Sequence, residues 1–599
     1  MPAPEAPSRL RRLLPPIGSA RYHLLLGLVA VLVLGPLGGI SAAFMNFSIG
    51  FFIGGQVLAG ILGSTVTLGY GPEGKHGANY MQTMAASVAG MSAMAVLIQA
   101  RYWLGLPAVP AWQLILYYTC CGMFGVGLGM VYTPVLVDRM QLAFPSGLAV
   151  ANILRALTDK VLLRRSVAKL GGGIFVGYVG GLASLKVAAV DALGVSTSTF
   201  GAGMIVGARI ALPALVVALV GDGLKPYLIG IGWLGPGDPF RKIGFIIALG
   251  TIMGAALVDV TLILAEAVRR LRRSSAPAAP PEDWKRVNAW RLTLWVAFWG
   301  TAVVVVGHGV LGEPVRFLVV AVALACLFVL VNGISLGISD SNPISSAFVL
   351  TVFILAAVGL TDAGTGLMCA SILLIACSEG GDMQQDRSTG WRLGTNRVVQ
   401  FRYQVIGIAF GAVLAVVLAK VFMGAYPVLT ADQFGRHVAG AEKWQSAMTY
   451  KFVGALRGIT TAQPQVLRAL WIGIGIGFGT EIVRKLVKRS TRYLTWARTT
   501  RGGGVFDFIF DAFLLPSPYA SSFGGFVELA TCYWWAAGGT LGTLYEVVTR
   551  RLAARRGTTG DGGVPADMST TSLVGGGLIA GDSLAALSVG VYGLLHTLF

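Results

Sequence analysis

Long apolar runs separated by short polar or basic stretches form the dominant pattern of this chain of 599 residues. Charged side chains are largely kept out of these runs, as in 317–338 and 406–422. A helix that crosses a bilayer needs about 20 mostly apolar residues. We therefore predict an all-α polytopic membrane protein with about sixteen transmembrane helices, some broken or re-entrant. The predicted spans are 24–44, 46–70, 82–103, 112–136, 170–191, 200–221, 242–267, 292–311, 314–338, 343–360, 362–379, 401–424, 465–483, 503–518, 522–548 and 571–598.

The composition agrees with a membrane protein and predicts no metal site or cofactor. Charged residues make up 12% of the chain, about half of the roughly 25% in ordinary soluble proteins. The 82 glycines allow helices to approach closely or to break around a ligand. The six cysteines and five histidines are scattered, without a CxxC pair or zinc-ligand spacing.

The net charge of +19 comes from basic loops between apolar runs, which does not indicate a nucleic-acid partner. Cytoplasmic loops of membrane proteins carry such an excess of Lys and Arg. We predict a multi-pass protein of the plasma (inner) membrane with a cytoplasmic N-terminus and no cleavable signal peptide. The basic stretches are 9–21, 155–169, 269–291, 387–402, 484–501 and 550–556.

The number of predicted spans between successive basic stretches is even, with one exception. Only three spans separate 155–169 from 269–291, and a re-entrant or broken element at 227–237 would restore the parity. The Pro- and Ala-rich stretch 269–291 predicts a cytoplasmic linker. We thus expect a basic tail (1–21), an N-terminal membrane half (22–268), the linker (269–291) and a C-terminal membrane half (292–599). Related Gly-Ile-Ser segments in the two halves indicate either a two-fold internal repeat or a chance match.

Polar residues within membrane spans are costly and commonly mark a transport pathway. The first such group is Asn79, Gln82 and Thr83, whose side chains suit either a substrate or a neighbouring helix. The second is Phe144, Pro145 and Gly147, where a broken helix could present its N-terminus to an anion. For this second group, periodicity alone favours a surface turn before a cytoplasmic amphipathic helix.

A third polar group joins two apolar runs almost without a gap. It contains Ser341, Asn342 and Pro343, and the proline cannot continue a regular helix. Unwound backbone at membrane depth is tolerated where it lines a cavity or is buried in protein. The alternative is a loop in which Asp340 caps the next helix.

Acidic residues form the fourth group. Glu379, Asp382 and Asp386 directly follow an apolar run, and we expect Gly380-Gly381 to loosen the helix at this membrane edge. A carboxylate near the membrane can bind a proton reversibly. The alternative is a cytoplasmic helix cap in which Asp386 pairs with a nearby arginine. Asp582 lies within a glycine-rich apolar helix and is a further acidic candidate.

Five motifs, in order along nearly the whole chain, resemble those of the oligopeptide transporter (OPT) family, which includes yellow stripe-like metal-chelate transporters. The motifs are Asn79-Tyr80-Met81-Gln82-Thr83, Leu142-Ala143-Phe144-Pro145-Ser146-Gly147, Ser341-Asn342-Pro343-Ile344-Ser345, Gly381-Asp382 with Gln385, Asp386 and Gly390, and Gly577-Leu578-Ile579-Ala580-Gly581-Asp582. Three positions depart from the family pattern. Ala143 stands for the usual proline, Ser146 for a common glutamate and Asp582 for the expected glutamate.

The resemblance implies secondary active import of oligopeptides or of peptide-like or metal-chelate substrates, driven by the proton gradient. Its partners would be the substrate, protons and the lipid bilayer, and we retain a homodimer as a candidate assembly. The substrate-pathway candidates are Asn79, Gln82, Thr83, Phe144, Pro145, Gly147, Ser341, Asn342 and Pro343. The proton-coupling candidates are Glu379, Asp382, Asp386 and Asp582.

An enzyme, a passive channel and a scaffold are the alternatives to a transporter. The sequence contains no Walker loop, HExxH motif or nucleophile elbow, so we predict that the protein is not an enzyme. A passive channel or pore would show a repeated filter or charged rings, which are not apparent. A membrane-embedded scaffold without transport remains an alternative.

Overall fold

The computed structural model describes residues 14–598 except 51–54, 143, 188–194, 274–281, 340–343, 435–437, 439, 461–463 and 556–568. The described residues form helices and connecting turns, with no strand among them. This confirms the predicted all-α class. In chain order the helices are α2 (Ala20–Val29), α3 (Gly35–Ser48), α4 (Gly55–Thr67), α5 (Gly74–Ala93), α6 (Ala95–Trp103), α7 (Ala111–Thr133), α8 (Pro145–Ala156), α9 (Lys160–Lys186), α11 (Thr197–Val206), α12 (Ala208–Gly230), α13 (Arg241–Arg273), α14 (Ala289–Gly309), α15 (Val315–Ser339), α16 (Ile344–Ala357), α17 (Ala363–Leu393), α18 (Arg397–Ala425), α19 (Ala447–Thr460), α20 (Pro464–Arg489), α21 (Thr491–Thr499), α22 (Arg501–Ile509), α23 (Pro518–Phe526), α24 (Leu529–Arg555) and α25 (Thr570–Leu598).

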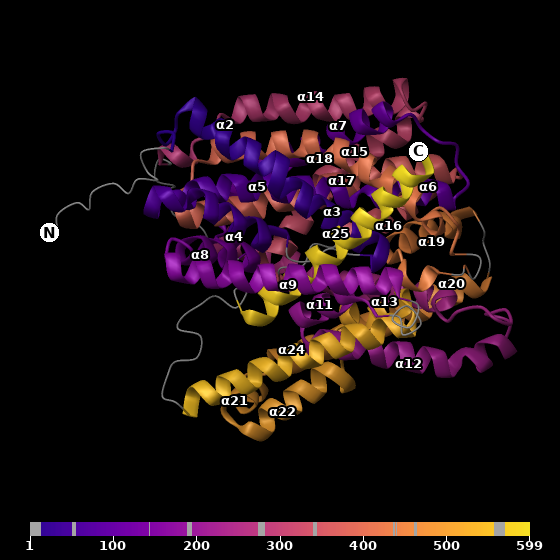
Figure 1. Ribbon diagram of the computed structural model, residues 1–599. Coiled ribbons are helices and arrows are strands. Elements are labelled where there is room, and N and C mark those ends of the chain that lie inside the picture. The colour runs from indigo at the N-terminus through magenta and orange to yellow at the C-terminus, as the bar shows by residue number, and fades with distance from the viewer. Residues whose placement is uncertain are drawn as a thin grey trace.

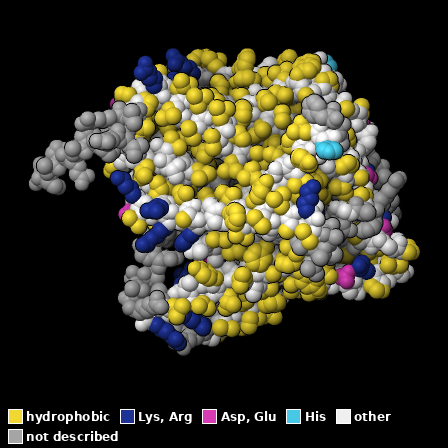
Figure 2. Space-filling view, in the orientation of Figure 1, with side chains coloured by type: hydrophobic (Ala, Val, Ile, Leu, Met, Phe, Trp, Pro, Cys, Tyr) yellow, Lys and Arg dark blue, Asp and Glu magenta, His cyan; other side chains and the backbone are white. Residues whose placement is uncertain are grey.

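Eleven helical segments of the described chain are long and apolar enough to cross a membrane. α14, α18 and α9 run in roughly the same direction across the view of Figure 1, at different heights, while α12, α21, α22 and α24 lie below them. Figure 2 shows that apolar side chains cover most of this face and that Lys and Arg gather mainly toward its left edge. An apolar face with charges at its border is the surface expected of a protein embedded in lipid.

Several other helices are too short to cross a bilayer, which explains part of the difference from the predicted sixteen spans. α8 has 12 residues, α11 has 10, α16 and α19 have 14 each, and α23 has 9, whereas about 20 are needed. The predicted spans 343–360 and 503–518 fall on such short elements. Broken helices of this kind keep polar backbone ends inside the protein, where they can line a cavity.

The chain breaks at a different place from the one predicted at 227–237. There α12 simply ends at Gly230 and a turn follows. The predicted span 200–221 is instead interrupted at Gly207, which has φ 76° and ψ 170° and separates α11 from α12. Only glycine adopts such a backbone conformation readily. The break at Gly207 was not predicted because the sequence on both sides of this glycine is apolar.

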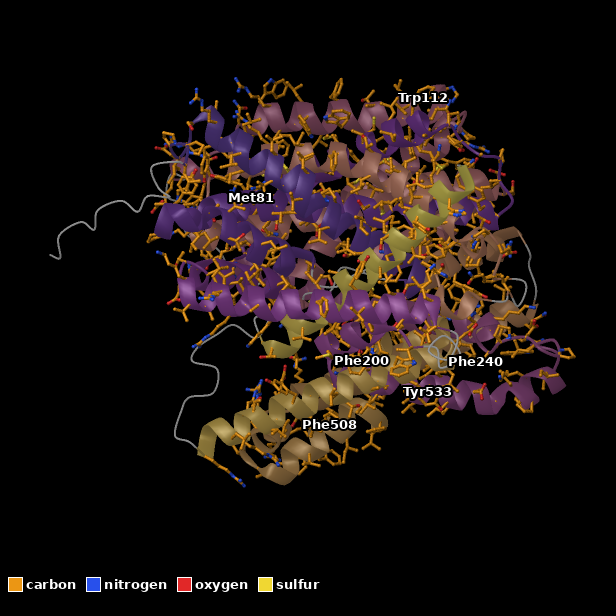
Figure 3. All side chains as sticks on the ribbon, in the orientation of Figure 1. Met81, Trp112, Phe200, Phe240, Phe508 and Tyr533 are labelled. Atoms are coloured by element: carbon orange, nitrogen blue, oxygen red, sulfur yellow. The ribbon has the colours of Figure 1, made fainter. Side chains whose placement is uncertain are left out.

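Side chains fill much of the space between the helices. Figure 3 shows Met81 among the upper helices, Phe200 and Tyr533 in the lower part, and Phe508 in the lowest helices. The largest apolar cluster includes residues of α7, α17 and α18, such as Phe124, Ile375 and Phe422. The division at 269–291 and the two-fold repeat stay predictions.

α17 is the central helix, and it differs from the helix expected from the sequence. It begins at Ala363, where Asp362 caps it by accepting a hydrogen bond from the Thr365 amide at 2.6 Å, and it continues unbroken to Leu393. The prediction of a span ending at 379, with a loosened helix at Gly380-Gly381, is therefore wrong. Nearly every residue of α17 is buried in protein rather than exposed to lipid, so polar residues can continue the helix.

Glycines allow α7 and α17 to pack with their backbones almost in contact. A Cβ atom added at Gly129 would lie 2.5 Å from the Gly380 carbonyl oxygen, and one at Gly125 would lie 2.7 Å from that of Ala376. Real Cβ atoms do not approach oxygens this closely, so these positions require glycine. Gly380 thus serves close helix packing, which is the ordinary role of small residues in membrane helices.

We predict that Gly129→Ala destabilises the protein, because the new methyl group overlaps the α17 backbone. Overpacking of this kind costs about 1–3 kcal/mol. The measurement is the apparent midpoint of thermal unfolding in detergent. Gly172→Ala on α9 is the control: its Cβ would meet nothing within 4 Å, and replacing a helical glycine by alanine adds roughly 0.5–1 kcal/mol of stability. Equal midpoints for the two variants would contradict the proposed close contact.

Candidate functional site

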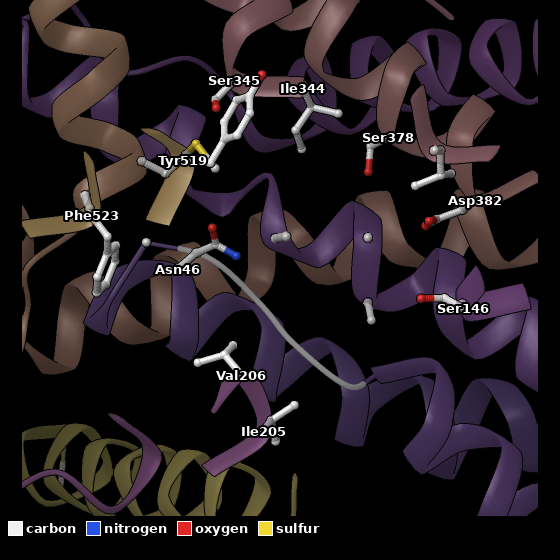
Figure 4. A pocket seen from close by; sticks show the side chains of 18 of the residues that line it. Asn46, Ser146, Ile205, Val206, Ile344, Ser345, Ser378, Asp382, Tyr519 and Phe523 are labelled. Atoms are coloured by element: carbon white, nitrogen blue, oxygen red, sulfur yellow. The ribbon is translucent and has the colours of Figure 1, made fainter. Parts of the chain in front are cut away.

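A cavity of about 810 Å³ lies inside the helix bundle, where several short helices begin or end. Its wall includes Ser146 near the start of α8, Val206 at the end of α11 and Ile344 at the start of α16. Figure 4 shows Ser378, Asp382 and Ser146 on one side, Tyr519 and Phe523 on the other, and Asn46 between them. The volume falls within the roughly 300–1,000 Å³ of typical small-molecule sites.

The three acidic residues of α17 lie on one face of the helix. Glu379, Asp382 and Asp386 are spaced by three and four residues, which places them above one another. Asp382 lines the cavity, while Glu379 and Asp386 are fully buried beside it. The structure therefore places these acids inside the bundle, whereas the sequence indicated a membrane edge.

Gly90 of α5 lies directly opposite two of these carboxylates. A Cβ atom at Gly90 would lie 3.0 Å from Glu379 Oε1 and 3.2 Å from Asp382 Oδ2. A larger residue would press against both acids. The glycine thus leaves the space that the two carboxyl groups occupy at the cavity wall.

Among the described residues, one amide and no arginine donates a hydrogen bond to these carboxylates. Asp386 Oδ1 accepts a hydrogen bond from Gln82 Nε2 at 2.9 Å. Both carboxyl oxygens of Glu379 are buried without a hydrogen-bond partner among the described atoms. No ion pair involving Asp386 occurs in the described part of the chain, so the predicted helix cap with an arginine pair is not what the structure shows.

Arg387 instead joins a network that links three helices. Its Nη1 donates to Gln400 Oε1 at 2.5 Å. Gln400 Nε2 donates to Thr83 Oγ1 at 3.1 Å and to the Asp386 carbonyl at 3.0 Å. α5, α17 and α18 are thus connected through polar side chains beside the acids. Buried networks of this type hold side chains in fixed positions.

The predicted residues Gln82 and Thr83 belong to this network and do not line the cavity. Asn79, one turn away, is fully buried, and its amide nitrogen and oxygen have no partner among the described atoms. The structure therefore places these three residues behind the cavity wall.

The structure buries Phe144 and Gly147 of the segment that periodicity assigned to a surface turn, while Pro145 is exposed. Phe144 is 0% exposed and has φ 42°, and its amide donates to the Gly337 carbonyl at 2.9 Å. Pro145 begins α8, and the Gly147 carbonyl accepts a hydrogen bond from Thr389 Oγ1 at 3.0 Å. The surface-turn interpretation is wrong for Phe144 and Gly147, because α15 and α17 pack against these two residues. From this segment, Ser146 reaches the cavity.

The predicted residues Ser341, Asn342 and Pro343, together with Asp340, lie outside the described residues. Their neighbours Ile344 and Ser345 line the cavity. Asp582 does not line it: its Oδ2 accepts a hydrogen bond from the Ser198 amide at 2.8 Å, at the start of α11. The structure thus separates Asp582 from the acids of α17 in position and environment.

Sequence reasoning missed Lys451, the second charged residue in the cavity wall. It lies in α19, between Tyr450 and Phe452, in a segment outside the sixteen predicted spans. A lysine inside an apolar stretch was the available signal. The described residues contain no group of three or more His, Cys, Asp or Glu side chains arranged to hold a metal ion.

Comparison with known proteins agrees with this architecture. The family model described as "OPT oligopeptide transporter protein" matches residues 22–591, nearly the whole chain. No curated protein matches the chain. The match does not show whether the chain belongs to the yellow stripe-like branch of the family. Members of the family are transporters and not enzymes. The chain, a multi-pass helical membrane protein with a partly polar internal cavity, therefore belongs to the OPT oligopeptide transporter family.

Proposed function

We propose that this protein is a proton-coupled secondary active importer of oligopeptides. The observation that carries the proposal is the acidic face of α17, where Asp382 lines the cavity and Glu379 and Asp386 are buried next to it. A single helix would then connect the substrate site with the groups that bind protons. Metal chelates are the second candidate substrate, and the absence of a preformed metal cluster among the described residues is compatible with a chelate that carries its own ligands.

The cavity wall suits a peptide whose side chains vary. Small residues of α5, such as Ala86, Ala89 and Gly90, form a smooth part of the wall. A few polar groups, including Asn46, Ser378 and Ser345, could hydrogen-bond to peptide bonds, which are common to all peptides. A mostly apolar wall with a few polar groups is typical of ligand sites.

The environment of Glu379 supports a role in proton binding. An ionised carboxylate that is buried without a partner carries a large desolvation cost, and a bound proton removes this cost. Glu379 and Asp382 are also close enough that both border Gly90, and two neighbouring negative charges repel each other. A proton shared within this acidic pair would relieve both costs.

Cellular placement is part of the proposal. We propose a plasma (inner) membrane protein with the N-terminus and the basic loops in the cytoplasm, acting as a symporter. The gathering of Lys and Arg toward one edge of the apolar face supports a single cytoplasmic side (Figure 2). Assembly as a homodimer stays a prediction.

Asp382→Asn, Glu379→Gln and Asp386→Asn test the coupling. We expect at least one of them to lower peptide accumulation by about tenfold, equivalent to about 1.4 kcal/mol, and to abolish its rise with external acidity. In Glu379→Gln and Asp386→Asn, whose acids do not line the cavity, exchange of peptide at equal concentrations should survive, because it needs no net proton movement. The measurement is uptake into proteoliposomes at several external pH values.

Asp222→Asn is the matched control, because Asp222 is half-exposed and pairs with Lys225 at 2.5 Å, away from the acidic face. Wild-type accumulation and pH dependence in all three acidic variants would show that the acids are structural. Uptake by the wild type that neither saturates nor responds to a pH gradient would instead indicate a passive pore.

Cysteine labelling tests the orientation. We expect cysteines introduced at Asp283 and Arg551 to resist an impermeant thiol reagent in intact cells, because both would face the cytoplasm. Pro314→Cys, in the exposed turn between α14 and α15, should be labelled from outside. The unmodified chain gives the background from its own cysteines, most of which are buried. Efficient external labelling at 283 and 551 would reverse the proposed topology.

A further inference from the structure

We propose that Lys451 binds the carboxylate end of a zwitterionic peptide whose ammonium end lies at Asp382. This inference rests on the proposed import of peptides and assigns them an orientation in the cavity. It names a specificity-determining residue, Lys451, that the sequence motifs do not include.

Lys451 and Asp382 are the charged residues among those that line the cavity. Neither forms an ion pair or a side-chain hydrogen bond with any residue that the structure describes. Lys451 Nζ lies 4.1 Å from the centre of the Phe526 ring. An aromatic face attracts a cation but accepts few hydrogen bonds, so the three N–H donors of the ammonium group stay available.

The unpaired state of Lys451 contrasts with that of three other lysines in the described part of this protein. Lys242 lies 2.9 Å from Asp238, Lys485 lies 2.8 Å from Asp259, and Lys488 lies 2.5 Å from Asp507. A charge removed from water without a partner is costly. At Lys451 a substrate carboxylate would supply the missing partner.

Nearby charged groups are already engaged with each other. Arg241, stacked on the Tyr450 ring at 4.6 Å, donates to Gln445 Oε1 at 2.9 Å and lies 3.6 Å from Glu528. Glu528 is therefore matched by Arg241, and it forms no ion pair with Lys451. An incoming carboxylate would meet Lys451 without displacing an internal partner.

The two charges lie toward opposite sides of the cavity. Lys451 contacts Phe526, which is three residues after Phe523 on α23. Figure 4 shows Phe523 and Tyr519 across the cavity from Asp382, with the side chain of Asn46 between the two sides. A cation and an anion separated by a polar amide match a short peptide in three features: its carboxylate, its peptide bonds and its ammonium group.

Charge complementarity of this kind selects ligands by their ends and tolerates varied side chains. The substrate class is therefore short peptides with a free carboxylate and a free amino group. Peptides that lack the carboxylate should bind weakly, because they leave the lysine desolvated and unpaired.

The test compares trialanine with trialanine amide as competitors of labelled trialanine uptake, and as ligands in a thermal-shift assay of the purified protein. For the wild type we expect amidation to weaken competition by at least about tenfold. In Lys451→Met, competition by trialanine should weaken by a similar factor. Amidation of trialanine should then not weaken the competition further. Lys451→Arg, which keeps the charge, should restore part of the preference for the free carboxylate.

Lys420→Met is the matched control, because Lys420 is exposed on α18 and away from the cavity wall. It should keep the wild-type preference. A wild type that does not distinguish the amide, or a Lys451→Met variant that keeps the full preference, would overturn the inference. If Lys451→Met does not fold, Lys451→Arg and the wild-type comparison decide.

Failure of the proposed function gives a different result. If trialanine stabilises the protein but is not accumulated, coupled import fails, while the effect of amidation on the thermal shift still tests Lys451. If trialanine neither binds nor is taken up, both the peptide proposal and the role of Lys451 are contradicted.

Discussion

The close contact of α7 with α17 is the constraint on which the candidate site depends. Because Gly125 and Gly129 carry no side chains, α17 lies against α7 almost backbone to backbone and stays inside the protein along its whole length. A helix surrounded by protein can carry polar residues that lipid would exclude. The acids of α17 can therefore occupy the middle of a regular helix, next to a cavity, without facing the bilayer.

The short helices also shape the candidate site, because their ends border the cavity. α8, α11, α16, α19 and α23 each have an end at or near the cavity, where the bundle leaves space that a set of continuous spans would fill. Their capping and turn geometry is held by neighbouring elements, as when the Phe144 amide binds the carbonyl of Gly337. The rigid long helices thus position irregular backbone where a ligand could meet it.

The polar groups near the cavity divide into two kinds. Gln82, Thr83, Arg387 and Gln400 form hydrogen bonds, with one another or with Asp386, that connect α5, α17 and α18. Asp382 and Lys451 face the cavity and are not paired with any described residue. Paired groups of the first kind give rigidity, whereas unpaired charges of the second kind gain most from a ligand of opposite charge. This division accounts for a site that is rigid and open to a charged substrate.

The sequence by itself determined the class of protein, most of the long helices and the family, because apolar runs report which segments prefer lipid and because five motifs occur in family order. It did not determine where α17 ends, since hydropathy treats each residue as if lipid surrounded it, and α17 is surrounded by protein. For the same reason it assigned Phe144 to the surface, although α15 and α17 cover it. The tertiary structure alone brought Lys451 of α19 and Asp382 of α17 to one cavity. These residues are 69 positions apart in the sequence, and only the packing of the helices brings them together.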